Sequence, residues 1–125
     1  MKTVLLLTIA LIISVSCTKK NTYTITGTIA DSTQTQILLQ QRIDGKFVTI
    51  DSTNLTNGKF EFKGQVATTD IYYLSKGERD LLPFLLENST YTVTADSSVL
   101  AKAQVKGGSV QELFNSYKTM YDQYN

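Results

Sequence analysis

The stretch IDSTNLTNGKFEFKG, residues 50–64, contains the clearest fold signal in the chain. At its centre, Asn57 and Gly58 are residue types that tolerate a positive φ, which a two-residue type I′ turn requires. Apolar and polar side chains alternate after the turn, which predicts a strand with one buried face. We therefore predict a hairpin with Phe60 and Phe62 in the core. Its predicted cross-strand pairs are Thr56 with Lys59, Leu55 with Phe60, and Thr53 with Phe62.

A second turn of the same type precedes this stretch. Asp44-Gly45 separates two runs of strand-forming residues, 36–43 and 46–51. Pairing Ile43 with Lys46 across the turn sets the register of the whole hairpin. This register pairs Gln41 with Val48 and Leu39 with Ile50. It predicts that Ile37, Leu39, Ile43, Val48 and Ile50 share one face of the hairpin.

Short alternating or apolar runs continue on both sides of the two hairpins. The further predicted strands cover residues 22–30, 71–74, 84–87, 90–95 and 103–106. About eight short strands at this spacing predict an all-β fold, either an antiparallel β-sandwich or an open barrel. The core residues that we expect are Ile25, Ile50, Phe60, Phe62 and Val93.

The last residues predict one C-terminal amphipathic α-helix, at 109–125. Gly107-Gly108 ends the preceding strand, and Ser109 with Glu112 matches a capping box. Apolar residues then recur at helical spacing. They are Val110, Leu113, Phe114, Tyr117, Tyr121 and Tyr124. This stripe has two interpretations: it packs on its own sandwich, or it docks on another structure.

The first residues predict an export signal that is cleaved before the protein folds. Lys2 gives a positive start, and residues 4–13 are apolar except for Thr8. A helix of this length reaches about 15 Å, half of a hydrocarbon core of about 30 Å, so a membrane-spanning anchor is the weaker interpretation. Ser14-Val15-Ser16-Cys17 resembles the lipobox of bacterial lipoproteins, in which the cysteine is acylated. The alternative is an ordinary secretory signal with an incidental thiol.

These patterns divide the chain into four parts. They are a lipoprotein signal peptide at 1–16, a lipidated Cys17 with a short tether at 17–21, a β-sandwich domain at 22–108 and the helix at 109–125. Lipid on Cys17 predicts a protein anchored at the cell envelope. The tether Thr18-Lys19-Lys20-Asn21 lacks the acidic cluster that resembles a surface-export tag. We therefore expect the protein to face the periplasm, on the outer membrane rather than the inner one.

The composition excludes several classes of function. The chain of 125 residues has 12 basic and 11 acidic side chains, so it has no basic excess with which to bind nucleic acid. Because it has no His, it offers no His metal ligand, Ser-His-Asp triad or imidazole base. Lipid on Cys17, the single cysteine, leaves the mature chain without a disulfide or a redox pair. We expect no catalytic residue, no metal and no cofactor.

The order of the motifs is similar to that of a known domain. The motifs are Ile25-Thr26-Gly27-Thr28-Ile29, Ile50-Asp51-Ser52-Thr53, Asn57–Gly64, Tyr72-Tyr73-Leu74, Phe84–Asn88 and Val105-Lys106-Gly107. Together with the lipobox they resemble the β domain of unknown function that precedes the thioredoxin-like domain in bacterial AhpC/TSA thiol-disulfide oxidoreductase lipoproteins. In that family, catalysis belongs to a downstream Trp-Cys-x-x-Cys motif, whereas this chain has no Trp and no cysteine beyond Cys17. The resemblance thus implies a non-catalytic accessory module and not an enzyme.

Two serines carry a functional interpretation beside a plainer one. Asp51-Ser52 suggests a nucleophile, but no base accompanies it in the sequence, and Asp-Ser is common at turns and bulges. Ser32 and Ser52 each lie in Asp-Ser-Thr, which is similar to the acceptor of a periplasmic O-glycosylation system. A three-residue pattern also arises by chance.

Two other groups have the same double interpretation. Glu78-Arg79-Asp80 suits a metal site or an acid/base pair, or else a solvated loop. Tyr72, Tyr73 and Tyr91 suit a carbohydrate-binding face, or else the core and rim of alternating strands.

Two functions remain after these exclusions. The first is a lipid-anchored accessory module that holds a thioredoxin-like domain near the membrane. The alternative is a stand-alone lipoprotein that binds another envelope protein or has a structural role. Coding sequence beyond Asn125 would favour the first function. A stop codon at Asn125 together with exposed tyrosines on the C-terminal helix would favour the second.

Overall fold

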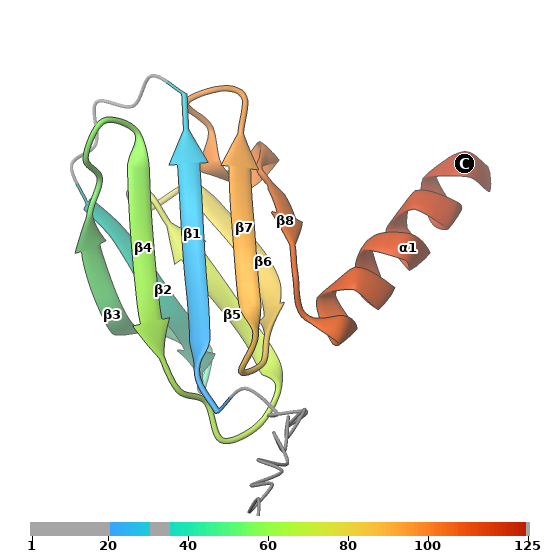
Figure 1. The fold of residues 1–125 in the computed structure, drawn as a ribbon, viewed down its shortest axis with the longest axis horizontal. Coiled ribbons are helices and arrows are strands. Elements are labelled where there is room, and N and C mark those ends of the chain that lie inside the picture. Colours follow the sequence, from blue (N-terminus) through green and yellow to red (C-terminus); the bar gives the residue numbers. More distant parts are fainter. Residues whose placement is uncertain (1–20, 31–35, 125) are drawn as a thin grey trace, which may run out of the picture.

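The computed structural model describes residues 21–30 and 36–124 as a β-sandwich with a helix at one side (Figure 1). Its strands are β1 (Tyr23–Ile29), β2 (Gln36–Ile43), β3 (Lys46–Asn54), β4 (Lys59–Gly64), β5 (Asp70–Ser75), β6 (Leu81–Leu86), β7 (Thr90–Ala95) and β8 (Gln104–Lys106). A short 3₁₀ helix, η1 (Leu100–Lys102), precedes β8, and α1 (Ser109–Tyr124) follows it. The predicted all-β fold with one C-terminal helix is therefore confirmed.

The strands form two four-stranded sheets that pack face to face. The first sheet has the order β4-β1-β7-β8, and the second has the order β3-β2-β5-β6. The pairings are antiparallel except between β1 and β7, which run parallel, with Ile25 opposite Tyr91. β3 and β6 are the edges of the second sheet, and β6 is where Pro83 lies. Proline suits an edge strand because it has no N–H to donate to a neighbour.

The predicted hairpin at Asn57-Gly58 is only half correct. Both turn residues have positive φ, 51° and 73°, and Thr56 and Lys59 exchange two backbone hydrogen bonds of 2.9 Å. The ladder stops there, because β3 lies in the second sheet and β4 pairs with β1 in the first. The predicted pairs of Leu55 with Phe60 and of Thr53 with Phe62 are wrong. The turn carries the chain from one sheet to the other, and β1 supplies the partner against which β4 buries its two phenylalanines.

The Asp44-Gly45 hairpin forms as predicted near its turn and departs from the prediction further away. Ile43 pairs with Lys46 and Gln41 pairs with Val48, but Leu39 pairs with Asp51 and not with Ile50. A bulge between Leu39 and Gln40 makes Ile50 the extra residue of β3. Because the extra residue shifts the alternation of β3, Ile50 leaves the face that it was predicted to share with Leu39. Ile37 and Leu39 are buried, whereas Ile43, Val48 and Ile50 are exposed, so Ile50 is not a core residue.

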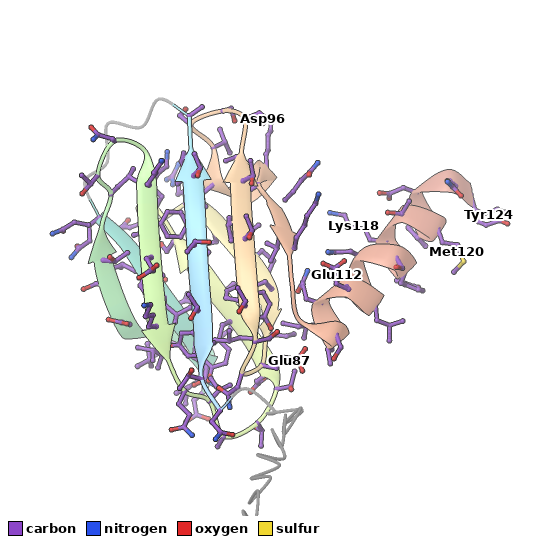
Figure 2. All side chains as sticks on the ribbon, in the orientation of Figure 1. Glu87, Asp96, Glu112, Lys118, Met120 and Tyr124 are labelled. Carbon is purple, nitrogen blue, oxygen red and sulfur yellow. The ribbon has the colours of Figure 1, made fainter. Side chains whose placement is uncertain are left out.

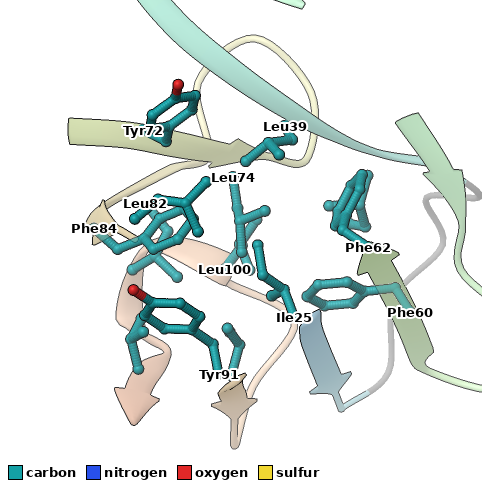
Figure 3. Close-up of a cluster of buried hydrophobic side chains, with 14 of the residues drawn as sticks. Ile25, Leu39, Phe60, Phe62, Tyr72, Leu74, Leu82, Phe84, Tyr91 and Leu100 are labelled. Atoms are coloured by element: carbon teal, nitrogen blue, oxygen red, sulfur yellow. The ribbon is translucent and has the colours of Figure 1, made fainter. Parts of the chain in front are cut away.

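The core fills the space between the two sheets (Figure 3). The predicted core residues Ile25, Phe60, Phe62 and Val93 are all buried. The ring of Tyr91 is also fully buried and meets Phe84 edge to face, with ring centroids 5.8 Å apart. Aromatic rings from both sheets therefore interlock at the centre of the domain.

Two glycines of the first sheet lie under aromatic rings from the neighbouring strand. Gly27 of β1 faces Phe60 of β4, and Gly64 of β4 faces Tyr23 of β1. A Cβ atom on either glycine would overlap the ring opposite. The absence of a side chain at these positions thus lets two large rings lie flat against the sheet.

Candidate functional site

A chain of side-chain amides fixes the base of α1 to both sheets. The backbone N–H of Leu85 donates to Oε1 of Gln111 at 2.7 Å, and Nε2 of Gln111 donates to Oδ1 of Asn115 at 2.9 Å. Nδ2 of Asn115 then donates to the carbonyl of Val105 at 2.7 Å. Leu85 lies in β6 and Val105 in β8, so the amide bridge of Gln111 and Asn115 joins one edge of each sheet. Gln111 is buried by these contacts, with 3% of its surface exposed.

The first turn of α1 is held by carboxylates. Oε1 of Glu87 accepts hydrogen bonds from the hydroxyl of Ser109 and the N–H of Val110, both at 3.2 Å. Oε1 of Glu112 accepts from the N–H of Gly107 at 2.7 Å. The predicted helix start is confirmed, but Ser109 bonds to Glu87 in place of the helix N–H that a capping box requires. Negative charge at this end of a helix also stabilises it through the helix dipole.

Helix α1 turns its polar side toward the sandwich and its apolar side away from it. We call the apolar side the outer face of α1. It comprises Val110, Leu113, Tyr117, Met120, Tyr121 and Tyr124, with Phe114 at its margin, where Phe114 also lines a cleft between α1 and the sandwich; all seven are between 36% and 84% exposed. In Figure 2, Glu112 and Lys118 point to the sandwich side of the helix, and Met120 and Tyr124 point to the opposite side. The interpretation that the aromatic stripe packs on its own sandwich is therefore wrong.

A cleft of about 380 Å³ lies between α1 and the side of the sandwich formed by β6 and β8. Its lining combines apolar side chains, among them Leu82 and Phe114, with polar ones that include Gln104, Lys106, Glu112 and Lys118. The Glu112 carboxylate is already engaged by the N–H of Gly107. The cleft therefore offers cations and hydrogen-bonding groups next to the amide bridge, without a nucleophile paired to a base.

The charged loop between β5 and β6 has a structural role through Asp80. The Asp80 carboxylate accepts from the N–H groups of Leu100 and Ala101, both at 2.7 Å, and so caps η1. Lys76 lies 3.6 Å from the same carboxylate. Glu78 and Arg79 are exposed in this loop, as the solvated-loop interpretation predicts. Within residues 21–30 and 36–124, no group of three or more His, Cys, Asp or Glu side chains could hold a metal ion.

The three tyrosines do not form a common aromatic face. Tyr72 and Tyr91 are buried, while Tyr73 is half-buried and meets Phe47 edge to face. The Tyr91 hydroxyl donates to the carbonyl of Leu85 at 3.0 Å and accepts from the N–H of Glu87 at 2.9 Å. Burial raises the pKa of Tyr91 above its ordinary value of 10.0. These tyrosines belong to the core and rim, which was the plainer interpretation.

The predicted modification residues are placed only in part. Cys17 and Ser32 lie outside the described residues, and Ser52 is exposed on the edge strand β3. Oδ1 of Asp51 accepts from the backbone N–H of Ser52 at 2.8 Å, which is a local turn-like contact and not activation of the hydroxyl. The nucleophile interpretation of this pair thus finds no support in its geometry.

The amide bridge is the feature that the sequence interpretation missed. Gln111 and Asn115 are four residues apart, which places them on one side of a helix, opposite the aromatic stripe. This spacing indicates that the two side chains can act together, but it does not indicate the groups to which they bond. The partners are backbone groups of two edge strands, and only the tertiary fold brings these groups to the same side.

The fold and this site define a two-sheet β domain with a helix attached at the edge strands β6 and β8. The chain belongs to the family described as Domain of unknown function (DUF4369), which matches residues 23–114. The match runs from β1 to the second turn of α1 and includes Gln111 of the amide bridge. No curated protein and no solved structure matches the chain.

Across the part of the chain that the structure describes, no helix has both the length and the apolar character needed to cross a membrane.

Proposed function

We propose that the protein is a non-catalytic module of the bacterial cell envelope, anchored by lipid on Cys17 and facing the periplasm. The lipobox-like sequence before Cys17 supports the anchor. The lack of His and of a second cysteine supports a role without catalysis. In this role the domain resembles the accessory module that precedes thioredoxin-like domains, and it holds such a domain near the outer membrane.

The observation that carries this proposal is the way in which α1 is attached to the sandwich. The amide bridge fixes the base of the helix to both sheets, while its outer face stays exposed. A rigid base with an exposed apolar face is suited to position another protein structure relative to the sandwich. The cleft beside α1, in contrast, has no catalytic arrangement.

The same exposure favours a second candidate function. A stand-alone lipoprotein of the envelope would use the outer face of α1 to bind a different envelope protein. Tyr117 and Tyr124 are 58% and 84% exposed, which is one of the two conditions for this alternative; the other is a stop codon at Asn125. Peptides that extend beyond Asn125 in the native protein would separate the two functions.

Replacement of the anchoring residue tests the proposal directly. Cys17→Ala should move the protein from the membrane fraction to the soluble fraction of its own host, because the acyl chains supply the membrane affinity. The neighbouring substitution Thr18→Ala is the matched control and should leave the protein in the membrane. Persistence of Cys17→Ala in membranes would refute the lipid anchor and indicate an uncleaved signal.

The intact mass of the native protein tests the anchor and its modifications together. The mass should equal that of residues 17–125 plus acyl chains, or should exceed it with peptides beyond Asn125 if a further domain follows. Hexose-containing peptides at Ser32 or Ser52 would establish O-glycosylation there, and their absence would refute it. An unmodified Cys17 thiol would overturn the proposed function.

A further inference from the structure

We propose that the outer face of α1 binds the outer face of a second copy of this chain, in a two-fold dimer with the two helices parallel. This inference goes beyond the proposed function, because it names a partner for a surface that the domain leaves exposed. Its parallel orientation rests in part on the proposed anchor, as given below.

The spacing of the outer face is that of a helix-pairing surface. Val110, Leu113, Tyr117, Met120 and Tyr124 follow one another at intervals of three, four, three and four residues. These are the a and d positions of two heptads, at which residues of paired helices interlock. Phe114 and Tyr121 lie next to this seam and widen it on one side. A membrane-surface helix needs no such repeat, since a bilayer accepts any apolar face.

The sandwich does not obstruct this surface. The amide bridge attaches α1 through Gln111 and Asn115, which lie on the opposite side of the helix. Beyond its base the helix extends away from the sandwich (Figure 1). Two copies can therefore bring their outer faces together with each sandwich on the outside of the pair.

The charges on α1 also favour a second copy. In a parallel two-fold pair, the residues on one side of the seam face those on the other side of the seam in the second copy, so like charges at these positions would repel. The flanking positions are Ser109, Ser116 and Gln123 on one side and the two aromatic residues on the other. The charged residues Glu112, Lys118 and Asp122 lie on the remaining sides of the helix. The pairing surface thus carries no charge against itself.

The area of the outer face is sufficient for a stable dimer. Aromatic side chains bury about 150–250 Å² each, so covering seven half-exposed apolar side chains buries roughly 650 Å² per copy. A dimer then buries about 1,300 Å² in total, within the range of about 1,200–2,000 Å² for specific interfaces. Leu113 and Tyr124, at 71% and 84% exposed, gain most from the contact.

Two observations select the parallel orientation. Val110 at position a and Leu113 at position d are the residue types that favour parallel two-stranded pairing. In addition, two copies anchored through Cys17 in one membrane have their sandwiches oriented alike, which suits a two-fold axis along the membrane normal. An antiparallel pair would place Leu113 about eight residues from its counterpart, or about 12 Å along the helix axis.

Cross-linking of full-length protein in its own membrane tests the pairing and its orientation. Leu113→Cys should form a disulfide-linked dimer under mild oxidation, because d positions of a parallel pair lie within the Cα separation of about 4.4–6.8 Å that a disulfide needs. Lys118→Cys, on the sandwich side of the helix, is the matched control and should form no disulfide between copies. Unsubstituted protein should also form no disulfide, since lipid occupies Cys17. If the unsubstituted protein cross-links, Cys17 carries a free thiol. That result would refute the lipid anchor but not the pairing of the helices.

Light scattering of the full chain in mild detergent gives a second measurement that needs no cysteine. The chain should have the mass of a dimer, and Tyr117→Glu should lower the association constant at least about tenfold, or about 1.4 kcal/mol. Tyr117 is exposed, so this change should leave the fold intact. The control Lys118→Glu should remain dimeric.

Three results would overturn the proposal. The first is a monomeric mass together with no cross-link at Leu113→Cys. The second is a dimer that persists in Tyr117→Glu, because another surface then forms it. The third is a monomer whose outer face is covered by a different protein domain or by the bilayer.

Discussion

At the scale of single residues, the pairing of β1 with β4 depends on two glycines, which have no Cβ atom. Gly27 and Gly64 each face an aromatic ring across the ladder, and the rings of Phe60 and Tyr23 occupy the space that a Cβ would take. Glycine weakens most strands because it has no side chain to pack. Here the aromatic ring of the paired residue fills the space above the glycine, so the core stays packed at this position.

Gly27→Ala should therefore destabilise the domain. The added methyl overlaps the ring of Phe60, and relief requires movement of a buried side chain, which costs about 1–3 kcal/mol in the free energy of unfolding. Urea denaturation followed by far-UV circular dichroism measures this change. Thr28→Ala, at the adjacent exposed position of β1, is the control and should change the free energy by less than about 0.5–1 kcal/mol. Equal effects of the two substitutions would contradict the role of Gly27.

At the scale of elements, α1 illustrates how an amphipathic helix can dock through its polar side. Its hydrophobic stripe determines that a helix forms, but two amides determine where the helix lies. Both partners of the bridge are edge-strand groups, the N–H of Leu85 and the carbonyl of Val105. Edge strands present such groups without a neighbouring strand, so they are available to a side chain.

Gln111→Ala should separate the helix from the sandwich. The change removes the acceptor of the Leu85 N–H and the donor to Asn115, and loss of hydrogen bonds at a buried position costs about 1–3 kcal/mol. Hydrogen exchange at the Leu85 amide should accelerate, and protection in the first turns of α1 should fall. Gln123→Ala, near the exposed end of the same helix, should leave both unchanged. An unchanged Leu85 amide in Gln111→Ala would show that the bridge does not fix the helix.

Local sequence patterns predict the turns and strands better than they predict which strands pair with each other. The turns at Asp44-Gly45 and Asn57-Gly58 form as expected because positive φ is a property of the turn residues themselves. Their flanking strands differ, since the first turn joins strands of one sheet and the second crosses between sheets. The two turns look alike in sequence. The pairing of β4 with β1 depends on contacts between residues that are about 30 to 40 positions apart in the chain.

The errors around Ile50 and α1 have related causes. Alternation continues through Ile50 in the sequence, so a bulge that inserts one residue leaves no local mark, yet it places Ile50 at 48% exposed. The stripe of α1 likewise predicts a helix without predicting which structure covers the stripe. In both cases the outcome depends on distant backbone groups and not on side-chain periodicity.

At the scale of the whole molecule, three buried tyrosines, which lie in both sheets, make the stability of the fold depend on alkaline pH. Burial raises the pKa of Tyr23, Tyr72 and Tyr91 above the ordinary value of 10.0. Nearby carboxylates raise these values further, from Asp51 for Tyr23 and from Asp70 for Tyr72. The folded protein therefore holds these protons more tightly than the unfolded chain does.

Between pH 8 and about pH 10 these tyrosines should consequently leave the stability unchanged, and above about pH 10 they should lower it. Below the unfolded pKa of about 10, both states are protonated; above it, the unfolded chain loses protons first, and the stabilisation is lost as the pH rises through the folded pKa values. Urea midpoints between pH 8 and pH 11 measure this decline. Tyr91→Phe should make the decline shallower, while Tyr124→Phe changes an exposed residue and should keep the original profile. A decline that begins below pH 9 would contradict the assignment to buried tyrosines.

The parallel pairing of β1 with β7 has a consequence for the order in which the chain can fold. β1 is the first strand to emerge when the polypeptide is delivered N-terminus first, yet its partner on one side ends at Ala95. Pairings between such distant segments are slow, because a long loop must close before any contact rewards it. The first sheet therefore cannot be completed until most of the domain has been delivered. In the export that we propose, the first sheet would therefore stay incomplete until β7 had crossed the membrane.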